Sequence, residues 1–334
     1  MNKLKSVGII GTGSCLPDRI MTNSDIEKIV DTSDEWIKSR TGICERRIAD
    51  ENTATSDLST IAAVKALENA NLKPEDIDLI IVATVSPDMV FPSTACLVQK
   101  NIGAVNAAAF DLEAACTGFM YGLAVAENFV KTGYYKHVLV IGAETLSKIT
   151  DFTDRNTCVI FGDGAGAAVV SEVPEEYGIL STYIGSDGRG GDLLKLPAGG
   201  SRMPATVESV QNRLHYIKMD GSEVFKFAVK IMGGAAEKAL EKCGLNKEDI
   251  DYLIPHQANI RIIDAAVRRL KIPKEKVYVN VDKYGNMSAA SVAIALDEAS
   301  RSGFLKDGDI TVLVAFGGGL TWGAAVLKWK GIGR

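Results

Sequence analysis

A stretch from the first half of this chain recurs in the second half. Residues 62–81, AAVKALENANLKPEDIDLII, and residues 235–254, AAEKALEKCGLNKEDIDYLI, are identical at twelve of twenty positions, at a constant offset of 173. Both copies have the pattern of a helix, a polar connector and an apolar strand. Two copies of a helix–strand unit of this size predict a protein built from two similar halves that are related by an approximate twofold axis.

Shorter echoes support the same division. GAAVV at residues 166–170 returns as GAAVL at residues 323–327, and AAC at residues 114–116 returns as AAS at residues 289–291. GAAVV and GAAVL each come at the end of a glycine-rich loop and a strand. AAC and AAS each come after a turn and open a helix. We therefore expect two packed halves whose paired turns face each other at a shared centre.

A polar segment separates the two copies. Residues 171–177 contain Pro174 and three acidic residues, so we expect an N-terminal domain at residues 1–173 and a C-terminal domain at residues 174–334. Within residues 72–88, the run LIIVA is apolar throughout, which is typical of a strand that helices cover on both faces. The expected fold class is therefore α/β.

The composition excludes several classes of protein. The 334 residues are 46% hydrophobic and 24% charged, with a formal net charge of −5, whereas general nucleic-acid binding needs a basic surface. No apolar run approaches the roughly 18 residues that are needed to cross a bilayer. We therefore expect a cytoplasmic chain that binds neither nucleic acid nor membrane.

The cysteines and histidines are scattered along the chain. No CxxC pair occurs, so the pattern predicts free thiols, one of which is a candidate nucleophile. The three histidines stand far apart and form no ligand motif, so we expect no metal site. The six cysteines are Cys15, Cys44, Cys96, Cys116, Cys158 and Cys243.

The segment around Cys116 holds the strongest candidate. Residues 107–126, AAAFDLEAACTGFMYGLAVA, predict a buried strand, a tight turn, and a helix from Thr117 onward. Cys116 then lies at the first turn of that helix, where the helix dipole favours the thiolate, which is a nucleophile. Most free cysteines are instead small buried hydrophobes, so this segment alone leaves both roles open.

Three loops of the second half carry polar residues or consecutive glycines. His256 follows a buried strand directly, an unusual place for a purely structural histidine, and Asn259 opens the next helix. Asn286 lies in a Gly-Asn turn before another helix. The three glycines at residues 317–319 stand between two strands, where their backbone amides can approach a ligand closely.

Several longer motifs, in this order, resemble the thiolase-fold condensing enzymes, and specifically the β-ketoacyl-acyl carrier protein synthase III family. They run from about residue 34 to residue 323, so the resemblance covers nearly the whole chain. It implies a five-layered αβαβα architecture of two similar halves and a homodimer. The motifs are DEWIKSRTGICERR, FPSTACLVQ, AACTGF, TDRNTCVIFGDGAGA, HQANIRI, YGNMSAAS and FGGGLTWG.

The resemblance assigns a catalytic role to three side chains. It implies that Cys116 is acylated by a thioester and that His256 and Asn286 stabilise the enolate formed when a malonyl thioester loses carbon dioxide. Backbone amides of Cys116 and Gly318 are expected to stabilise the tetrahedral oxyanion. Elongating relatives use two histidines, and degradative thiolases need a second cysteine near the C-terminal glycine loop, which residues 316–322 lack.

The resemblance also implies contacts for the starter substrate. Trp36, Arg40 and Arg155 match the coenzyme A contacts of the family, since an indole can stack on adenine and guanidinium groups suit phosphates. Three further residues are expected at the acyl pocket. They are Phe91, which would reach the pocket of the partner subunit, Phe316, and Met287, where the family more often has a small Thr-like residue.

A basic surface is expected to dock the second substrate, malonyl-acyl carrier protein, which is acidic. On the helix at residues 259–270, Arg261 and Arg268 lie one heptad apart on the face opposite Ile262 and Ile263. Lys226 and Arg269 match basic positions of the family. An ordinary solvated surface is the alternative for all four.

The expected activity is that of an initiating condensing enzyme of type II fatty acid synthesis. An acyl-CoA starter, expected to be acetyl-CoA, would condense with malonyl-acyl carrier protein to give 3-oxoacyl-acyl carrier protein, carbon dioxide and CoA, without any cofactor besides the CoA thioester substrate. One alternative is a related condensing enzyme of secondary metabolism with another starter or acceptor. A non-catalytic scaffold is the other, and the intact trio of Cys116, His256 and Asn286 argues against it.

Overall fold

Two mixed β-sheets form the framework of the protein, as a computed structural model that describes residues 4–332 shows. The first sheet has the order β1 (Val7–Cys15), β7 (Asp163–Glu172), β6 (His137–Thr145), β4 (Leu79–Ala83) and β5 (Ala108–Leu112). The second has the order β8 (Gly178–Ser186), β13 (Thr321–Lys328), β12 (Ile310–Gly317) and β11 (Tyr252–Pro255).

The two sheets follow one plan, which the repeat predicted. In the first, β4 runs parallel to β6 and β5, while β7 is antiparallel to β6 and β1. In the second, β11 runs parallel to β12, while β13 is antiparallel to β12 and β8. A parallel bridge between Leu253 and Val277 stands where a fifth strand would lie. The position of the boundary near residue 173 remains a prediction.

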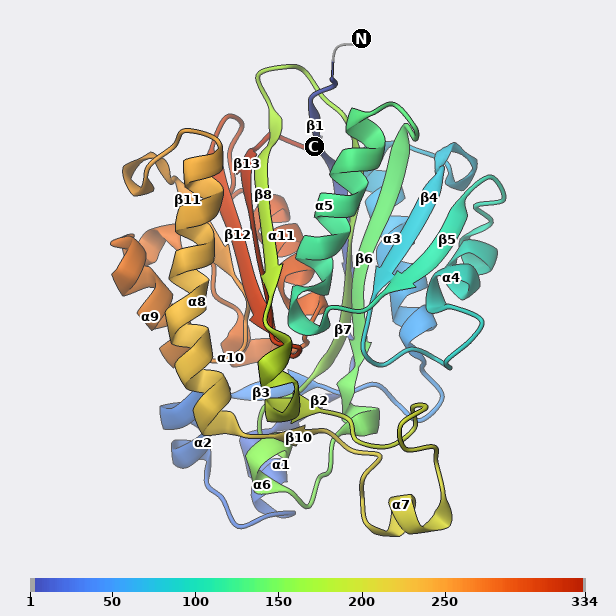
Figure 1. The fold of residues 1–334 in the computed structure, drawn as a ribbon, viewed down its shortest axis with the longest axis vertical. Coiled ribbons are helices and arrows are strands. Elements are labelled where there is room, and N and C mark those ends of the chain that lie inside the picture. The colour runs from blue at the N-terminus through green and yellow to red at the C-terminus, as the bar shows by residue number, and fades with distance from the viewer. Residues whose placement is uncertain (1–3, 333–334) are drawn as a thin grey trace.

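Helices cover both outer faces and fill the space between the sheets (Figure 1). Helices α3 (Thr55–Ala70) and α4 (Thr94–Ile102) cover the first sheet, and α8 (Gly221–Lys242) and α9 (Ile260–Leu270) cover the second. Between the sheets lie α5 (Gly118–Lys131) and α11 (Ala290–Arg301), which contact strands of both. This is the expected αβαβα arrangement of layers.

The inner helix α11 comes very close to the first sheet because glycine faces it. A Cβ atom on Gly166 would lie 2.6 Å from the Cβ atom of Ala293, and one on Gly142 would collide with the carbonyl oxygen of Ala289. Alanines on the helix and glycines on the strands therefore set the thickness of the central layer.

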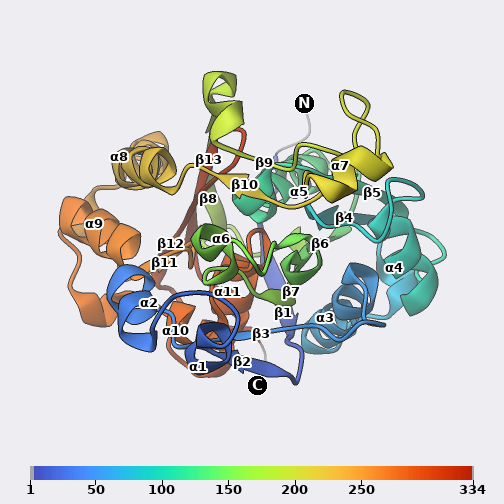
Figure 2. The same ribbon diagram turned by 90° about the horizontal axis from the view of Figure 1, so that it is seen from below.

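Shorter elements close the lower end of the molecule. In Figure 2, seen from below, the segment with β9, β10 and α7 lies beside α6, and the two segments contact each other through β10. The guanidinium group of Arg213 fixes this segment by donating to both carboxylate oxygens of buried Asp151, at 2.7 and 2.5 Å. The remaining elements are β2 (Ile20–Thr22), α1 (Asn23–Glu27), α2 (Asp34–Thr41), β3 (Glu45–Arg47), α6 (Arg155–Cys158), β9 (Leu194–Lys195), α7 (Val207–Gln211), β10 (Lys218–Met219) and α10 (Val281–Tyr284), with the 3-10 helices η1 (Pro74–Asp76), η2 (Ala115–Thr117), η3 (Leu146–Ile149), η4 (Gly188–Leu193), η5 (Lys247–Asp249) and η6 (Lys274–Lys276).

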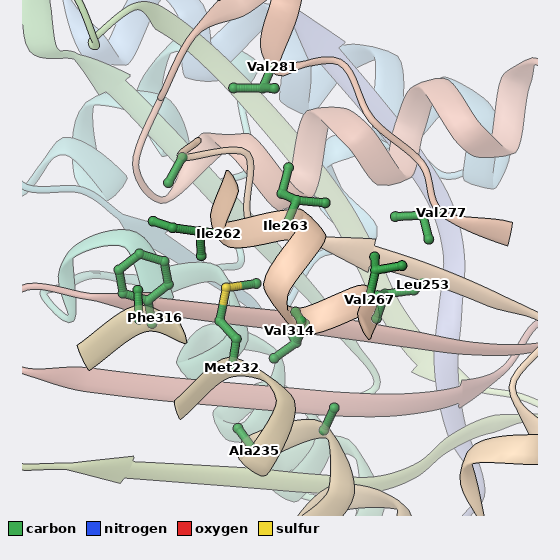
Figure 3. Close-up of a cluster of buried hydrophobic side chains, with 14 of the residues drawn as sticks. Met232, Ala235, Leu253, Ile262, Ile263, Val267, Val277, Val281, Val314 and Phe316 are labelled. Atoms are coloured by element: carbon green, nitrogen blue, oxygen red, sulfur yellow. The ribbon is translucent and has the colours of Figure 1, made fainter. Parts of the chain in front are cut away.

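A hydrophobic cluster fixes the outer helices of the second half. Figure 3 shows Met232 of α8 and Ile262 and Ile263 of α9 beside Val314 and Phe316 of β12. These side chains are at most 5% exposed, so the start of α9 is held firmly against the end of β12. His256 stands shortly before the start of α9, and the glycine-rich loop follows the end of β12.

One prediction about the strands is wrong. The strand before Cys116 was expected to be buried, but β5 is the edge strand of its sheet, and Phe110 on it is 37% exposed. Within residues 4–332, every helix is too short or too polar to span a bilayer.

Candidate active site

The candidate nucleophile lies where the first sheet passes into the inner layer. Cys116 is in η2, directly before α5, and its side chain is 8% exposed. The preceding residue, Ala115, has a left-handed backbone (φ 46°), which marks the sharp bend of the turn. The predicted turn and helix are therefore present at the predicted place.

The glycine-rich loop packs directly on this turn. A Cβ atom on Gly317 would lie 2.7 Å from the amide nitrogen of Cys116, so only glycine permits this approach. The hydroxyl oxygens of Thr117 and Thr321 lie 2.8 Å apart, and Thr321 also donates to the Gly318 carbonyl at 2.9 Å. Cys116 and Gly318, the residues expected to donate to an oxyanion, are thus held on adjoining segments.

His256 follows β11 directly, as predicted, and is fully buried. Its ring meets that of Phe316 edge-on, with centroids 5.7 Å apart. Within the described part of the chain, neither Nδ1 nor Nε2 has a hydrogen-bond partner. Burial lowers the pKa of His256 to about 3, so the imidazole is neutral at physiological pH and one of its nitrogens carries a proton that it can donate.

The side chain of Asn286 is oriented by its own turn. Its Oδ1 accepts a hydrogen bond from the Ser288 amide at 2.8 Å, while its backbone amide donates to the Ile160 carbonyl at 2.9 Å. Since Oδ1 is occupied by a backbone donor, the amide group is fixed in one orientation. Nδ2, which makes no hydrogen bond to any residue of the range 4–332, remains available as a donor.

One cavity brings these three side chains together. It has a volume of about 1090 Å³, and Cys116, His256 and Asn286 all line it. Trp36 and Arg40, both expected to contact coenzyme A, line the same cavity. The cavity therefore connects the buried trio with the more exposed residues of α2.

Arg155 lies beside this cavity rather than on its lining. Its guanidinium carbon is 4.3 Å from the centroid of the Trp36 ring, a stacked cation–π arrangement. The two residues come from α2 and α6, more than a hundred positions apart in the sequence. The three residues expected to bind coenzyme A thus form one group.

The protonation state expected for Cys116 is wrong for the free protein. The helix dipole was expected to favour the thiolate, but the pKa of the Cys116 thiol is raised to about 12, chiefly by burial and to a smaller extent by the nearby Glu144 carboxylate. The nearby Ser288 hydroxyl group lowers this pKa without compensating for the burial. The resting nucleophile is therefore a thiol, which must lose its proton before it can attack.

A second, mostly apolar cavity of about 420 Å³ borders Cys116 on another side. Gly318 and Ser288 line it together with Cys116, so the cavity reaches both the glycine-rich loop and the Asn286 turn. Its apolar lining comes from segments that are distant in sequence, namely Val85, Leu146, Ile149, Phe161, Leu194, Leu196 and Ile217.

The expected acyl-pocket residues do not line this second cavity. Phe316 lines the larger cavity instead. Met287 borders neither cavity, because it is fully buried against Tyr284, Ala290 and Ile294; its size therefore has no direct effect on pocket shape. Phe91 is 83% exposed and belongs to neither cavity of its own chain.

The four basic residues expected to dock a carrier protein differ in their partners. Lys226 pairs with Glu223 (2.6 Å) and Arg269 pairs with Glu237 (2.7 Å). Arg261 and Arg268 are exposed on α9 and form no ion pair with any residue that the structure describes, although Arg261 stacks on the Phe225 ring at 5.1 Å. Arg261 and Lys226 both line the larger cavity.

Sequence reasoning missed two polar residues beside the nucleophile. Glu144, at the end of β6, and Ser288, in the turn before α11, are buried, and both affect the pKa of Cys116. Ser288 stands within the quoted YGNMSAAS motif, two positions after Asn286, so its nearness to the site could have been inferred. Glu144 gives no sequence signal except a charged residue at the end of an apolar strand.

Two family descriptions match the chain. The one described as "3-Oxoacyl-[acyl-carrier-protein (ACP)] synthase III" matches residues 110–188, and the one described as "3-Oxoacyl-[acyl-carrier-protein (ACP)] synthase III C terminal" matches residues 240–329. Each match contains one side of the site: Cys116 lies in the first, and His256 and Asn286 lie in the second.

Whole-chain comparisons agree. A beta-ketoacyl-[acyl-carrier-protein] synthase III of Caldanaerobacter subterraneus subsp. tengcongensis is 67% identical over 325 residues, which cover 97% of this chain and 98% of the relative. The crystal structure of 3-oxoacyl-[acyl-carrier-protein] synthase III from Aquifex aeolicus is 51% identical, with a TM-score of 0.90 over 97% of this chain and all of that chain. The priming β-ketosynthase of the R1128 polyketide biosynthetic pathway is 36% identical, with a TM-score of 0.91 over all of this chain and 99% of that one.

The fold, the grouped site and the comparisons lead to one conclusion. The relatives match over nearly their whole length, and the resemblance that the motifs indicated is confirmed. By its layers, its repeat and these matches, the chain belongs to the β-ketoacyl-acyl carrier protein synthase III family of thiolase-fold condensing enzymes.

Proposed function

We propose that Cys116, His256 and Asn286 carry out the initiating condensation of fatty acid synthesis, the reaction of this family. An acyl-CoA and malonyl-acyl carrier protein would give 3-oxoacyl-acyl carrier protein, carbon dioxide and CoA. The observation that carries the proposal is that one cavity joins a buried thiol, a neutral imidazole and an oriented carboxamide. No cofactor besides the CoA thioester substrate is required for this chemistry.

The first half-reaction acylates Cys116. Its sulfur attacks the thioester carbonyl, the carbon–sulfur bond to coenzyme A breaks, and the thiol loses its proton. The negative charge on the tetrahedral oxygen would be stabilised by the backbone amides of Cys116 and Gly318, which adjoining segments hold in place. Such preorganised donors usually contribute more than any other single effect.

The second half-reaction decarboxylates the malonyl group. His256 and the Nδ2 group of Asn286 would donate hydrogen bonds to the thioester oxygen as the enolate forms. Because burial keeps His256 neutral, it does not place an acidic imidazolium beside the carbanion, which would otherwise be quenched. The carbanion then attacks the acyl carbonyl, and the Cys116 sulfur leaves.

The two cavities would hold different parts of the starter. The larger one passes Trp36 and Arg40, and beside them stands Arg155, so the adenine and phosphates of coenzyme A would lie there. The smaller cavity is apolar and ends at Cys116, so it would receive the acyl chain. At about 420 Å³, it has room for more than an acetyl group.

Arg261 and Arg268 are the favoured contacts for the acidic carrier protein. Both are exposed on α9 and have no acidic partner among the residues described. Lys226 and Arg269 already pair with Glu223 and Glu237, so they would contribute less. Arg261 also lines the larger cavity, so a carrier protein docked there could deliver its malonyl group toward His256.

A homodimer would complete the acyl cavity. The edge strand β5 has unpaired backbone groups, and the nearby residues Val90 and Phe91 are 86% and 83% exposed. An open strand edge beside exposed apolar side chains suits isologous pairing with a second copy. In such a dimer, Phe91 of each copy would reach the acyl cavity of the other.

Two further expectations stay predictions. A cytoplasmic location is supported by six cysteines that are all free.

A role in secondary metabolism is the alternative function, because the priming β-ketosynthase of the R1128 polyketide pathway is 36% identical to this chain. A panel of acyl-CoA starters and carrier proteins, read out by product mass, would distinguish these two functions.

The test of the proposed function is acylation of Cys116. Purified protein mixed with acetyl-CoA should gain the mass of one acyl group, and peptide mapping should place it on Cys116. Cys116→Ala should gain none and should make no 3-oxoacyl product with malonyl-acyl carrier protein, whereas Cys96→Ala, a change at an exposed thiol, should behave as the native protein does. Acylation of Cys116→Ala would contradict the assignment.

A further inference from the structure

A carboxyl group is buried beside the nucleophile without a positive partner. Glu144 is the second-to-last residue of β6, and its side chain is 0% exposed. Its carboxylate accepts hydrogen bonds from Ser86 Oγ (2.5 Å), Thr84 Oγ1 (3.1 Å) and the Val85 amide (3.2 Å), all in the turn after β4. No Lys, Arg or His among residues 4–332 forms an ion pair with it. Burying such a group is costly, and the roles proposed above leave it unused.

The same burial tunes this carboxyl group for proton exchange. Burial raises the pKa of Glu144 to about 7, although its hydrogen bonds with Ser86, Val85 and Thr84 and the nearby Ser288 hydroxyl group act in the opposite direction. The group is therefore partly ionised at neutral pH. A carboxylate whose pKa lies near the working pH is the kind that accepts and returns protons in catalytic sites.

Ser288 lies next to both Glu144 and Cys116. Its nearby hydroxyl group lowers the pKa of the thiol and that of the carboxyl group. In the present conformation, however, its buried Oγ meets the full distance and angle of a hydrogen bond with neither. Ser288 and Cys116 nevertheless line the same cavity, and a change of the Ser288 χ1 rotamer would move Oγ into hydrogen-bond geometry. Ser288 therefore provides a path between thiol and carboxylate.

The backbone holds Ser288 in this place. Its φ angle of 44° is left-handed, which is uncommon for a residue other than glycine. Its amide donates to Asn286 Oδ1, and the next residue, Ala289, presses on β6 so closely that a Cβ atom on Gly142 would collide with its carbonyl oxygen. The turn thus lies over the part of β6 that ends at Glu144.

Few other titratable groups face this path. Glu113, from the segment before η2, raises the pKa of the thiol as Glu144 does. Asp163, on the neighbouring strand β7, directs its carboxylate to the Ser147 amide (2.8 Å). His256 lines the same cavity as the thiol but is neutral. Lys195 lines the smaller cavity with Cys116, but its ammonium group pairs with Asp192 at 2.7 Å. Among these groups, none is a free positive charge that would stabilise a thiolate.

Two negative charges would repel each other if Cys116 ionised while Glu144 was also ionised. Moving the thiol proton onto the carboxylate avoids this, because the charge is transferred and no second charge is created. We propose that Glu144 accepts the Cys116 proton through Ser288 during acylation and returns it when condensation releases the sulfur. The inference rests on the proposed acylation of Cys116.

The proton balance of both half-reactions closes. In acylation, Ser288 Oγ takes the proton from Cys116 Sγ and gives its own to Glu144; the Sγ–acyl bond forms, and coenzyme A leaves as a thiolate that takes a proton from water. In condensation, the carbon–carbon bond forms and the Sγ–acyl bond breaks. The Sγ thiolate then recovers the stored proton along the same path, so each turnover takes up one proton from solvent.

The test is the pH profile of single-turnover acylation with acetyl-CoA, measured by quenched-flow mass analysis. In the native enzyme, the rate should rise with pH and level off above about 7, as Glu144 becomes ionised. Glu144→Gln should lose this inflection and acylate about 100-fold more slowly at pH 7.5, since general-base groups typically contribute 10²–10⁴-fold. Ser288→Ala should show the same loss, and the double variant should lose little more, because both act on one path.

Controls separate this role from structural damage. Decarboxylation of malonyl-acyl carrier protein, which does not use the thiol proton, should be unchanged in Glu144→Gln, and Glu144→Asp should restore part of the acylation rate. Glu127→Gln, at a buried carboxylate that pairs with Lys131 on α5, should keep the native profile. A Glu144→Gln enzyme with an unchanged or faster acylation profile would overturn the inference. Failure of the native enzyme to acylate at all would instead refute the proposed function.

Discussion

At the scale of single residues, burial sets the protonation states on which the site depends. Both Cys116 and His256 lose access to water, and each favours its uncharged form as a result: the pKa of the thiol rises to about 12, and that of the imidazole falls to about 3. A neutral donor suits enolate formation, but a neutral thiol cannot attack. The site therefore needs a proton acceptor that it uses only during acylation.

His256 should make stability depend on pH in the acid range. Its ordinary pKa of 6.5 applies to the unfolded chain, and its folded value is about 3. Since the unfolded chain takes up the proton first, the stability that the neutral ring contributes is present above pH 6.5 and is lost as the pH falls toward 3. While only the unfolded chain is protonated, the loss is about 1.4 kcal/mol per pH unit.

Denaturant unfolding between pH 6.5 and 4.5 measures this effect. His256→Gln has no titrating ring, so its free energy of unfolding should fall less steeply on acidification than that of the native protein. Parallel curves for the two proteins would show that His256 is not held neutral by burial.

The sequence predicted the charged and catalytic candidates better than the shape of the pocket. Cys116, His256 and Asn286 follow strands or turns that motifs make visible, and one cavity indeed joins them. The lining of the acyl cavity comes from residues such as Leu146, Phe161 and Ile217, which are ordinary apolar residues until the fold brings them together. Met287 was placed wrongly because its neighbour in sequence faces the site, while its own side chain faces the core.

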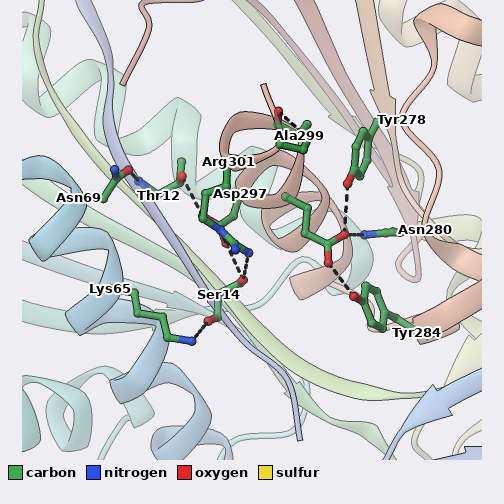
Figure 4. Close-up of polar contacts among 12 residues, drawn as sticks. Thr12, Ser14, Lys65, Asn69, Tyr278, Asn280, Tyr284, Asp297, Ala299 and Arg301 are labelled. Atoms are coloured by element: carbon green, nitrogen blue, oxygen red, sulfur yellow. Dashed lines mark hydrogen bonds and ion pairs between the residues drawn. The ribbon is translucent and has the colours of Figure 1, made fainter. Parts of the chain in front are cut away.

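At the scale of elements, the turn that carries Asn286 is anchored from both sides. Figure 4 shows Tyr278, Asn280 and Tyr284 converging on one carboxylate. It belongs to Glu298 of α11, which accepts from Tyr284 Oη at 2.6 Å and from Asn280 Nδ2 at 2.7 Å. Helix α11 therefore holds the Asn286 turn in two ways. Its first residues follow the turn directly, and Glu298, two helical turns further on, binds residues that precede the turn.

Replacing a glycine under this helix should disturb the site without touching a catalytic residue. Gly142→Ala would place a Cβ atom against the carbonyl oxygen of Ala289, and overpacking of this kind costs about 1–3 kcal/mol. Because α11 would shift together with the Asn286 turn, malonyl decarboxylation should fall as well. Gly200→Ala, at a position with no atom within 4 Å of the added Cβ, is the matched control.

Thermal unfolding and carbon dioxide release, measured on both variants, check this prediction. A Gly142→Ala protein with native stability and native decarboxylation would show that the contact between β6 and α11 can relax without consequence.

The elements were predictable where local signals are strong. The helix–strand repeat, the turn at Cys116 and the helix that Asn259 opens all have caps or periodic apolar residues, and the structure has each of them. The exposure of β5 was not predictable, because small apolar residues such as Ala108 and Ala109 suit an edge strand and a buried strand equally. Which strand ends a sheet is decided by topology, which local sequence does not contain.

At the scale of the whole molecule, charge is distributed unevenly. The chain carries a formal net charge of −5, yet Arg261 and Arg268 stand exposed on α9 without an acidic partner in residues 4–332. An acidic protein that binds another acidic protein needs a local basic surface of this kind. Because Arg261 also lines the larger cavity, Arg268 allows the cleaner test.

Arg268→Ala should raise the KM for malonyl-acyl carrier protein a few-fold and leave acylation by acetyl-CoA unchanged, since Arg268 does not line the cavity. The native enzyme should lose affinity for the carrier protein as salt rises, because exposed charges are screened within about 8 Å at physiological ionic strength. In Arg268→Ala, the KM for malonyl-acyl carrier protein should depend less on salt.

Lys226→Ala should raise this KM less than Arg268→Ala does, because Lys226 is already paired with Glu223. Equal KM values for native enzyme and Arg268→Ala would remove this surface from docking.

The central claim is that Cys116 takes the acyl group while His256 and Asn286 act on the malonyl group. Its most direct test is to measure the two half-reactions separately, by acyl mass on the protein and by release of labelled carbon dioxide, in Cys116→Ala, His256→Ala and Asn286→Ala. We predict that Cys116→Ala acquires no acyl group. His256→Ala and Asn286→Ala should still be acylated, but each should release carbon dioxide about 100- to 1,000-fold more slowly, the usual cost of losing one such donor. Near-native decarboxylation by either of these two variants, or acylation of Cys116→Ala, would contradict the account.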